Sequence, residues 1–437
     1  MRHATEPRFP FADMSRVPYA VFLDEGVYER EQARIWQGPV WLFLGLEAQI
    51  PNPGDYITTY AGDQSVVVDR AEDGSLHAFV NSCAHKGTMV VRYRKGSAAS
   101  HTCVYHRWAY DLRGNLVGVP FLRGIEGRSG MPKDFDKRDH ALRKLKVESY
   151  RGVVFGSFAP KPEPLRAYLD KPILDFLDRL FARPIEVIGH RRQRFHANWK
   201  QYYENYGDGY HGGLLHELAA TFGLHRATQG GSRIPDKRGR HAAAWVDAEG
   251  DSLDMVRASY RGVDFAKSFD QRLKLDDLAV FGWRDEVGDG QSVRTCAVFP
   301  SALFAQVGNV LETEQIRPKS ATEFELYWTY FGYQDEPADL RRRRFQQANM
   351  VGPAGYNNME DGEASILEMR GIRRRGSEHT VLEMGGRGAI KREDGHDRLS
   401  ETVVRGFWRY YAELMGYRPA SILKKRRRVK KLRRRSR

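Results

Sequence analysis

The sequence of 437 residues contains only three cysteines and no long run of apolar residues. Three thiols are too few for a disulfide framework, which favours a reducing compartment. The longest apolar stretch, VWLFLGL at residues 40–46, is far too short to cross a bilayer, and residues 1–16 have no apolar stretch of the signal-peptide type. We therefore expect a cytoplasmic protein without a membrane partner.

Excess positive charge is nearly absent outside the C-terminal end, although the formal net charge is +14. Residues 424–437 carry 11 basic and no acidic side chains, so residues 1–423 keep only about +3. A block of like charges repels itself and is typical of a disordered tail. We expect such a tail over residues 421–437, and a nucleic-acid partner is not expected because the rest of the chain has no matching basic stripe.

Residues 40–158 have the period-two pattern of a small β domain. The segment YDLRGNLVGV (110–119) predicts a hairpin with Gly114 and Asn115 at its turn. The other strand-like segments are DYITTY (55–60), SVVVD (65–69), LHAFVN (76–81) and GVVFGSF (152–158).

Residues after the proline-spaced APKPEPL (159–165) mix helical and strand patterns, which predicts an α+β region. LRAYLDKPILDFLDRL (165–180) has a helical period, and EPADLRRRRFQQANM (336–350) has a helix start with proline in its first turn. The strand-like segments are IEVIGH (185–190), TCAVFP (295–300) and FELYWTYFGY (324–333).

Two short segments, NSCAHKGT (81–88) and HTCVYHRWAY (101–110), each combine one cysteine with one histidine. Four such donors can hold a structural zinc, or a two-iron cluster with thiolates on one iron and imidazoles on the other. The mixed pairing in each loop differs from zinc-finger grouping, and the surrounding strands do not need zinc to fold. The pattern therefore favours the iron–sulfur cluster.

The spacing Cys83-x-His85 and Cys103-x-x-His106, with 17 residues between the pairs, resembles the Rieske [2Fe–2S] motif. Imidazole ligation raises the reduction potential of such a cluster, which suits one-electron transfer. Respiratory Rieske proteins carry two further cysteines where this chain has a threonine and a tyrosine, so the resemblance points to oxygenases. The third cysteine, in RTCAVF, is interpreted as a small buried residue.

A second histidine pair lies in NWKQYYENYGDGYHGGLLHELAATFG (198–223). On a continuous helix His211 and His216 would diverge by about 140°. We expect Gly212 and Gly213 to break the helix, so that both imidazoles converge, and Asp208 to lie beside His211.

Two histidines and one carboxylate form the facial triad of non-haem iron(II), which leaves positions open for O₂. The carboxylate candidates are in GPAGYNNMEDGEA (352–364), namely Glu360, Asp361 and Glu363, and their spacing does not choose among them. The alternative is a pair of histidines satisfied within the protein and a surface aspartate, without metal.

The Rieske motif, followed by NWK…EN…D.YH….H and GPAG…ED, resembles the large (α) subunit of Rieske non-haem iron aromatic-ring-hydroxylating oxygenases over residues 18–416. The resemblance implies an α+β fold, with an all-β Rieske domain and an α+β catalytic domain that has an antiparallel sheet of the helix-grip type. It divides the chain into an N-terminal segment packing on the catalytic domain (1–39), the Rieske domain (40–158), the catalytic domain (159–420) and the tail (421–437).

The same resemblance assigns roles to individual residues. Asp208 matches a carboxylate that connects a cluster histidine to an iron-binding histidine, and Asn205 matches a residue near that iron. The implied cluster ligands are Cys83, His85, Cys103 and His106, and the implied iron ligands are His211, His216 and Asp361. Similar members of the family have Lys-Asp-Pro around the connecting aspartate where this chain has Gly-Asp-Gly, so we expect a looser backbone there.

The implied assembly has three α subunits, alone or with three small β subunits, and each cluster serves the iron of a neighbouring subunit. The chain lacks a glycine-rich nucleotide motif, so NAD(P)H acts through a separate reductase, with or without a ferredoxin. The rival interpretations are a Rieske electron carrier without its own catalysis and a basic-tailed nucleic-acid binder.

The expected substrates are O₂ and a small aromatic acid. Segments such as LEAQIPNPGDY and GMPKDFD are similar to the anthranilate 1,2-dioxygenase and salicylate 5-hydroxylase types, which take ortho-substituted benzoates. We expect anthranilate-type dioxygenation, with salicylate-type monooxygenation as the alternative. His225 and Arg226 are candidates for binding the substrate carboxylate.

Overall fold

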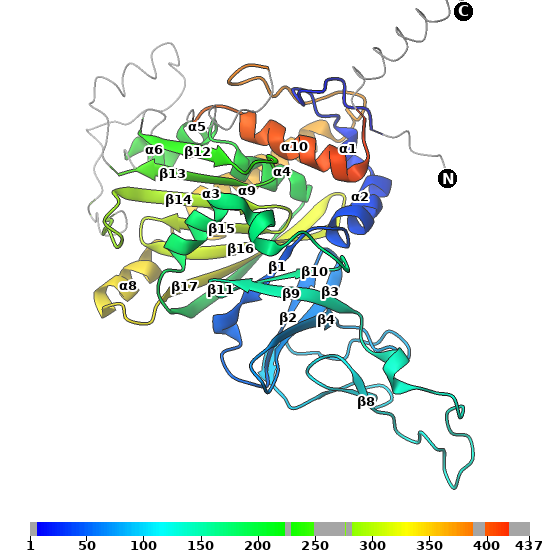
Figure 1. The fold of residues 1–437 in the computed structure, drawn as a ribbon. Helices are drawn as coiled ribbons and strands as arrows, with labels where there is room; N and C mark the ends of the chain where they lie inside the picture. Colours follow the sequence, from blue (N-terminus) through cyan, green and yellow to red (C-terminus); the bar gives the residue numbers. More distant parts are fainter. Residues whose placement is uncertain (1–6, 223–228, 249–275, 277–281, 388–397, 419–437) are drawn as a thin grey trace, which may run out of the picture. The chain divides into compact units, whose positions relative to one another are not determined.

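The computed structural model describes residues 7–222, 229–248, 276, 282–387 and 398–418 (Figure 1). The chain forms two compact units, Trp36–Tyr168 and Met1–Ile35 with Leu169–Arg437. The predicted Rieske domain, residues 40–158, falls inside the first unit. The predicted tail (421–437) and the candidates His225 and Arg226 lie outside the described residues.

The first unit is built on an antiparallel sheet of seven strands in the order β1-β10-β9-β4-β3-β2-β5. The strands are β1 (Leu42–Leu46), β2 (Asp55–Ala61), β3 (Gln64–Arg70), β4 (Leu76–Val80), β5 (Lys95–Ser97), β9 (Lys144–Tyr150) and β10 (Val153–Ser157). The four predicted strands coincide with β2, β3, β4 and β10, which confirms them. Short 3₁₀ turns, η2 (Glu47–Gln49) and η3 (Lys137–His140), connect parts of this unit.

A second, smaller sheet in this unit joins β6 (His101–Thr102), β7 (Ala109–Tyr110) and β8 (Leu116–Gly118). Strands β7 and β8 pair antiparallel, and Gly114 has a φ of 76° at the turn between them. Positive φ is a conformation that glycine adopts at no steric cost, so the predicted hairpin is confirmed. The two cysteine–histidine segments follow β4 and β6.

The second unit contains an antiparallel sheet of seven strands in the order β11-β17-β16-β15-β14-β13-β12. The strands are β11 (Ile185–Phe195), β12 (Gly231–Pro235), β13 (Ala242–Asp247), β14 (Gln291–Val298), β15 (Ala302–Val307), β16 (Val310–Ser320) and β17 (Glu323–Tyr333). The predicted strands at 185–190, 295–300 and 324–333 lie in β11, β14 and β17. Cys296 on β14 is fully buried, as predicted.

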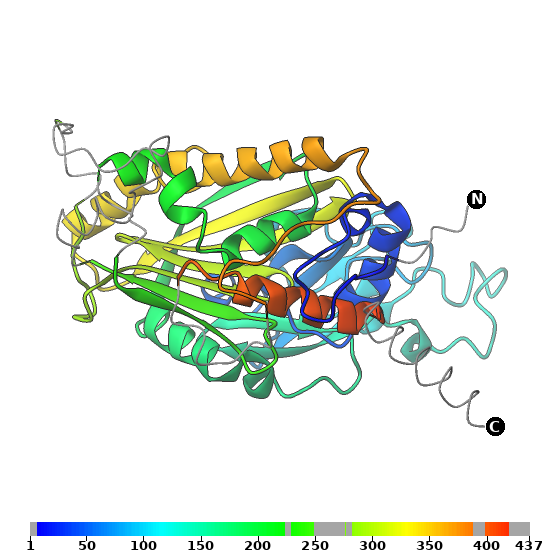
Figure 2. The same ribbon diagram turned by 90° about the horizontal axis from the view of Figure 1, so that it is seen from above.

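Helices cover one face of this sheet, where α4 contacts β14, β16, α9 and α10 (Figure 2). The helices of the unit are α1 (Ala20–Leu23), α2 (Glu25–Glu31), α4 (Trp199–Gly207), α5 (Gly212–Leu215), α6 (Glu217–Thr221), α8 (Ala338–Gln347), α9 (Tyr356–Ile372) and α10 (Thr402–Met415), and a π-helical turn, η1 (Gln32–Trp36), follows α2. None of the helices in the described part of the chain has the length and apolar character needed to span a bilayer.

Helix α3 (Leu165–Leu180) is interrupted, although the sequence predicts one continuous helix. Asp170 has φ 60° and ψ 166°, far from helical values. Pro172 explains why one helix cannot continue through this point, because it has no amide hydrogen to donate and its ring would clash with the carbonyl group four residues earlier; the break falls two residues before it, at Asp170.

A buried ion pair ties the N-terminal segment to the helices of the second unit. Lys200 Nζ on α4 lies 2.6 Å from Glu31 Oε1 at the end of α2, and both side chains are fully buried. Trp199 donates a hydrogen bond to Glu31 Oε2 over 2.8 Å, and the Tyr411 hydroxyl of α10 donates to Glu31 Oε1. Residues 25–31 are therefore held against α4 and α10 by charge-assisted hydrogen bonds.

Candidate metal centres and substrate cavity

The first candidate centre is formed by the two cysteine–histidine loops. Cys83 and Cys103 are free thiols and only 3% and 2% exposed. The half-buried imidazoles of His85 and His106 have ring centroids 4.5 Å apart. The structure thus brings the two loops together, with the thiols inside and the imidazoles nearer the surface.

Two contacts show that these residues fit a cluster. His85 stacks on Trp108, with ring centroids 4.9 Å apart, and among the described residues its buried Nδ1 has no hydrogen-bond partner. Burial, together with the positive neighbours His106 and Lys86, lowers the pKa of His85 and favours the neutral imidazole that binds metals. An orphaned buried nitrogen is costly unless a ligand satisfies it.

The hydroxyl of Tyr110 lies 3.2 Å from Cys83 Sγ. The amide of Ala84 donates to the same hydroxyl oxygen over 3.1 Å, so the hydroxyl hydrogen is available for the sulfur. Burial and the hydrogen bond with Cys83 raise the pKa of Tyr110, which keeps the hydroxyl protonated. Hydrogen bonds to a ligating sulfur tune the potential of iron–sulfur clusters.

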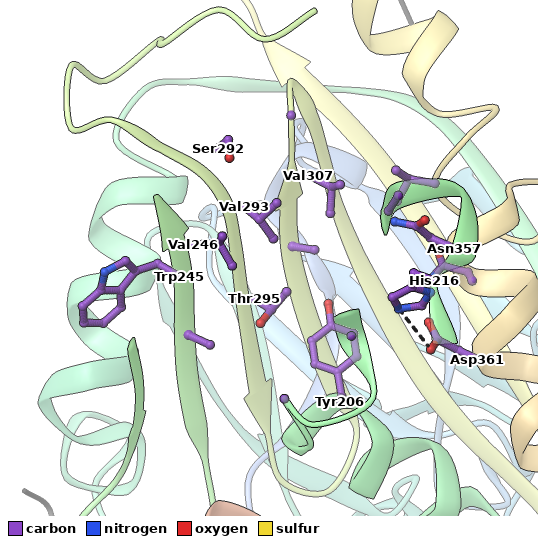
Figure 3. Close-up of a pocket in the computed structure, with 18 of the residues that line it drawn as sticks. Tyr206, His216, Trp245, Val246, Ser292, Val293, Thr295, Val307, Asn357 and Asp361 are labelled. Atoms are coloured by element: carbon purple, nitrogen blue, oxygen red, sulfur yellow. Dashed lines mark ion pairs between the residues drawn. The ribbon is translucent and has the colours of Figure 1, made fainter. Parts of the chain in front are cut away.

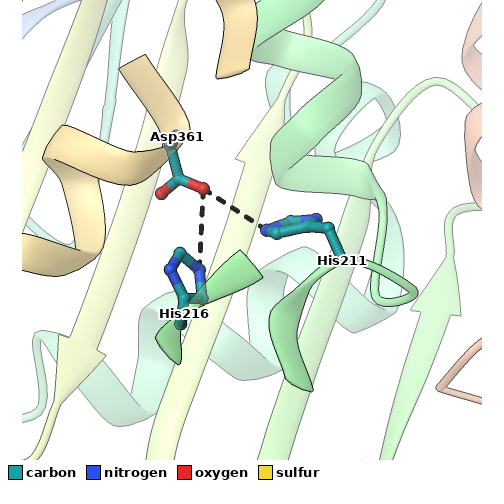
Figure 4. Close-up of side chains that lie close together, drawn as sticks. All are labelled: His211, His216 and Asp361. Atoms are coloured by element: carbon teal, nitrogen blue, oxygen red, sulfur yellow. Dashed lines mark ion pairs between the residues drawn. The ribbon is translucent and has the colours of Figure 1, made fainter. Parts of the chain in front are cut away.

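The second candidate centre combines His211, His216 and Asp361, whose ligand atoms all lie within 4.8 Å of one another. Asp361 Oδ1 is 3.4 Å from His211 Nε2 and 3.5 Å from His216 Nε2 (Figure 4). The two histidines come from the ends of α5, and the aspartate comes from α9. Two imidazoles and one carboxylate facing one point fit a non-haem iron(II) centre.

The predicted helix break is located wrongly. Gly212 and Gly213 lie inside α5, and the chain leaves helical geometry at Asp208 (φ −90°, ψ 121°) and at His216 (φ −79°, ψ 71°). Helix α5 is a single turn with His211 as its N-cap and His216 as its C-cap. The imidazoles converge, with ring centroids 5.3 Å apart, because the helix ends at both of them.

The structure separates the three carboxylate candidates. Asp361 lies between both histidines, whereas Glu360 Oε2 is 2.9 Å from His216 Nδ1 and the side chain of Glu363 is exposed. The sequence suggested Glu360 only as a possible metal ligand, and its contact with His216 Nδ1 was not predicted. Its position directly before Asp361 on the same helix could have indicated that it lies near the centre.

Each histidine is held by a carboxylate on the nitrogen that faces away from Asp361. Asp208 Oδ2 lies 3.2 Å from His211 Nδ1, and Glu360 does the same for His216. Such partners fix the tautomer and orientation of metal-binding imidazoles. Asn205 Nδ2 also donates to Asp361 Oδ1 over 3.2 Å, which places Asn205 beside the candidate iron centre.

The electrostatics of this centre favour positive charge. Burial lowers the pKa of His211, but hydrogen bonds with Asp208 and Asp361 outweigh it and raise the pKa to about 9. For Asp361, burial raises the pKa, but the neighbouring histidines and Asn205 reverse the effect and lower it. The carboxylates that stabilise a proton on His211 also attract a metal cation, which would bind the neutral imidazole in place of that proton.

The backbone around Asp208 is constrained, contrary to the expectation of looseness. A Cβ atom at Gly209 would lie 1.9 Å from the carbonyl oxygen of Arg398, so no side chain fits there. Asp208 also accepts a hydrogen bond from the amide of Tyr210 over 2.7 Å. The glycine permits a close approach of two segments and thereby fixes Asp208.

A second glycine determines the position of Asp361. A Cβ atom at Gly362 would lie 2.4 Å from Cε1 of Phe195, a fully buried residue at the end of β11. Helix α9 therefore approaches the sheet more closely than any residue with a side chain at 362 would allow.

A cavity of about 220 Å³ opens beside the second centre. Val246, Val293, Thr295 and Val307 line it from strands β13 to β15, across from His216 and Asp361 (Figure 3). An engineered apolar cavity of about 150 Å³ binds benzene. The cavity therefore has room for one substituted aromatic ring.

The wall of this cavity includes a half-buried cation, Arg233. Arg233 on β12 donates to the carbonyl oxygen of Tyr206 over 2.8 Å, whereas its Nε has no hydrogen-bond partner in the described part of the chain. Burial and the neighbouring Arg398 lower the pKa of Arg233 to about 10, against the opposing effect of Asp208, so the side chain stays charged near neutral pH.

Two protein families match the chain in the order of its domains. The Rieske [2Fe-2S] domain matches residues 40–129, and the ring hydroxylating alpha subunit (catalytic domain) matches residues 182–417. Together with the fold and the two centres, these matches define a Rieske-type oxygenase. The chain belongs to the ring-hydroxylating oxygenase α-subunit family.

Relatives with known activity support this family assignment. The chain is 45% identical to the anthranilate 1,2-dioxygenase large subunit of Burkholderia cepacia, over 95% of this chain and 96% of the relative. It is 38% identical to the salicylate 5-hydroxylase large oxygenase component of a Ralstonia species, over 94% and 97%. Naphthalene 1,2-dioxygenase from a Rhodococcus species has the same fold, with a TM-score of 0.74 at 24% identity, over 92% of this chain and 94% of that structure.

These findings confirm the predicted fold class, enzyme class and cofactors. The protein is an oxidoreductase that uses a Rieske [2Fe–2S] cluster and a mononuclear iron, with electrons from NAD(P)H supplied through a reductase. Members of the family are multicomponent oxygenases with oligomeric assemblies. The catalytic domain excludes an electron carrier without its own chemistry.

Proposed function

We propose that this large subunit of a terminal oxygenase uses O₂ to hydroxylate an ortho-substituted benzoate of the anthranilate type. The observation that carries the substrate class is the half-buried Arg233, whose buried Nε is unpartnered among the described residues and which lines the cavity beside His211, His216 and Asp361. A cation in the wall of a cavity whose surface is mainly apolar suits an aromatic carboxylate.

The proposed roles of the metal-centre residues follow their contacts. The proposed cluster ligands are Cys83, His85, Cys103 and His106, and the proposed iron ligands are His211, His216 and Asp361. When bound, the iron supplies positions at which O₂ is activated beside the aromatic ring. Asp208 holds His211 and connects it to a cluster histidine of a neighbouring subunit, and Asn205 orients Asp361.

The proposed substrate position uses both walls of the cavity. Arg233 binds the carboxylate in the role for which His225 and Arg226 were candidates. The valines on β13, β14 and β15 contact the ring and exclude water from the reacting carbons. Removing a charge-assisted hydrogen bond of this kind should lower the affinity for the substrate by about ten- to a hundredfold.

The proposed assembly is α₃ or α₃β₃, with a small β subunit, a reductase and, in some systems, a ferredoxin. The similarity to the anthranilate enzyme, at 45% identity, favours dioxygenation. The similarity to the salicylate enzyme, at 38%, supports a salicylate 5-hydroxylase-type monooxygenase as the second candidate.

The first test measures the iron and sulfide content of the purified protein, with electron paramagnetic resonance after reduction. The proposal predicts about three irons and two sulfides per chain, and His211→Ala should lose one iron without changing the Rieske signal. Zinc without sulfide would contradict both proposed centres.

The second test supplies NADH, a reductase and candidate benzoates, and identifies the products. Anthranilate, O₂ and two electrons from NADH should give catechol, carbon dioxide and ammonia, whereas 2,5-dihydroxybenzoate from salicylate would favour the monooxygenase candidate. Arg233→Met should raise the KM for the benzoate by about ten- to a hundredfold. Arg194→Met is a matched control, because Arg194 pairs with Glu323 on the surface. Oxidation of no benzoate would refute the proposed substrate class.

A further inference from the structure

Two glutamates on β16 line the cavity and have no role in the function described so far. Glu312 is 1% exposed and Glu314 is 0% exposed. They are two positions apart on one strand, so their side chains lie on the same face of the sheet. Within the described residues, Glu312 Oε2 and Glu314 Oε1 have no hydrogen-bond partner. Buried carboxyl oxygens without a partner are costly, so the pair requires an explanation.

The hydrogen bonds around Glu312 assign a proton to its carboxyl group. Tyr330 is hydrogen-bonded to Glu312, and the Tyr330 hydroxyl donates its hydrogen to the carbonyl oxygen of Val351 over 3.1 Å. A hydroxyl group has only one hydrogen to donate, so the hydrogen in the bond with Glu312 comes from the carboxyl group. Glu312 is therefore held as a neutral carboxylic acid.

A chain of contacts leads from Glu314 to the candidate iron centre. The Tyr202 hydroxyl on α4 donates to Glu314 Oε2 over 3.1 Å and accepts a hydrogen bond from Asn358 Nδ2 over 3.4 Å. Asn358 lies on α9, three residues before Asp361. Because Oε2 of Glu314 accepts the hydrogen of Tyr202, the unpartnered Oε1 is the oxygen that can carry a proton and release it.

Burial keeps both carboxyl groups neutral near pH 7. It raises the pKa of Glu312 to about 8, against the opposing effect of Arg191 on β11. Burial, with further contributions from Glu312 and Asp361, raises the pKa of Glu314 well above its ordinary value. The other titratable groups that face the pair are hydroxyl groups whose pKa burial also raises, namely those of Tyr202, Tyr206 and Tyr330.

We propose that Glu312 and Glu314 are an internal source of the protons that the reduction of O₂ consumes in this cavity. Dihydroxylation combines the aromatic ring, O₂, two electrons and two protons into one diol, so each oxygen atom gains one O–H bond. In each transfer the O–H bond of a carboxyl group breaks and a carboxylate remains. Protons from the solvent return to the carboxylates when water enters the cavity after product release.

The inference rests on the proposed function and deepens it by naming the proton donors. A cavity that excludes water during the reaction cannot take these protons directly from bulk solvent. A neutral carboxylic acid beside the reacting atoms is a suitable general acid, and it places no negative charge against an incoming benzoate.

The first test records the infrared carbonyl absorption of protonated carboxyl groups in the oxidised holoenzyme, without substrate or turnover. Glu312→Gln and Glu314→Gln should each remove one component at pH 7, and the Glu312 component should decline as the pH rises through about 8. Glu325→Gln is the matched control, because Glu325 lies on the neighbouring strand β17 and pairs with Lys319 over 3.5 Å. Spectra of both variants that equal the unmodified spectrum would overturn the inference.

The second test follows a single turnover of the reduced holoenzyme with O₂ and 2-aminobenzoate, so that the rate is independent of the amount of active protein. Glu314→Gln should slow product formation about a hundredfold, and Glu312→Gln about tenfold because its proton is already shared with Tyr330. Glu314→Asp, which keeps an acid, should retain more of the rate than Glu314→Gln.

The pH profile separates proton donation from a purely structural role. The unmodified rate should fall as the pH rises through about 8, because only the protonated carboxyl groups donate. The variant with both glutamates replaced by glutamine should be slow at every pH and should lack this decline. Rates in the Gln variants equal to the rate of Glu325→Gln would overturn the inference while leaving the proposed function intact.

Failure to oxidise any benzoate would instead refute the proposed function. The same comparison of variants would then use NADH-dependent O₂ uptake through the reductase, because the reduction of O₂ to hydrogen peroxide also consumes two electrons and two protons. Slower uptake in Glu314→Gln than in Glu325→Gln would support the proton source, and equal uptake would overturn it.

Discussion

The two candidate metal centres of this chain are built in different ways. The four proposed donors of the cluster centre lie between residues 83 and 106, on two loops of one small β unit. The three proposed donors of the iron centre come from the two ends of α5 and from α9, and they span residues 211 to 361. A centre formed by neighbouring loops is visible in a sequence motif, whereas the second depends on how distant helices pack.

The surroundings differ as well. The cluster thiols are buried, and one is hydrogen-bonded by Tyr110. At the iron centre a carboxylate lies behind each histidine, and a cavity lies beside the donors. The first arrangement is suited to tuning a reduction potential, whereas the second is suited to holding a ligand set rigid while leaving space for a substrate.

The largest effects should come from removing one donor from each centre. Cys103→Ser should abolish turnover and the Rieske signal while the mononuclear iron remains. Asp361→Ala should abolish turnover and lose that iron while the Rieske signal remains. Iron analysis and electron paramagnetic resonance of both variants check this independence, and loss of both signals in either variant would contradict it.

A smaller effect is expected at Asp208, which distinguishes orientation from ligation. Asp208→Asn should weaken iron binding about ten- to a hundredfold, because His211 loses its charged partner. The measurement is iron retention against a chelator. Asp335→Asn is a suitable control, since Asp335 is a largely exposed residue that pairs only loosely with Arg183. Unchanged retention in Asp208→Asn would show that ligation alone fixes His211.

Glu360 should have a weaker effect of the same kind. Glu360→Gln keeps the side-chain shape and a hydrogen-bonding oxygen but removes the charge behind His216, so iron affinity should fall by about tenfold. Glu363 is an exposed residue on the same helix, so Glu363→Gln is the matched control. Equal iron retention in both variants would remove Glu360 from the support of the centre.

The smallest effect should appear at the cluster. Tyr110→Phe removes the hydroxyl that faces Cys83 Sγ, so the reduction potential should fall by about 40 mV, the equivalent of one hydrogen bond of about 1 kcal/mol. Redox titration of the Rieske signal measures the change. Tyr93→Phe, at an exposed tyrosine, should leave the potential unchanged. A potential that does not move would mean that the hydroxyl does not donate to the sulfur.

Much of the fold was predictable, because strands in both units have clear period-two patterns or turn residues. The β7–β8 hairpin followed from Gly114, and the buried strand 324–333 from its apolar run. The interruption at Asp170 was not predicted, because the helical period continues through it and only Pro172 signals the change.

The candidate site was predictable in composition but not in geometry. The histidines and the three possible carboxylates were found in the sequence, and the family resemblance pointed to Asp361 among them. Spacing alone did not make that choice, because it depends on how α9 packs on the sheet. The helix break was assigned to the glycines because glycine disfavours helices, whereas α5 ends at its histidines. Gly209 was expected to add backbone freedom. The contact that restricts it is with Arg398, which lies 189 positions further along the chain, so the local sequence does not reveal it.

The absence of a side chain at Gly362 has a consequence for engineering the enzyme. Because α9 is a continuous helix, a methyl group at 362 would push against Phe195 and shift the adjacent Asp361 as part of the same rigid body. Such a substitution would alter a metal–ligand distance without touching any ligand. Libraries intended to change substrate range should therefore vary the strand side of the cavity and leave this helix–sheet contact unaltered.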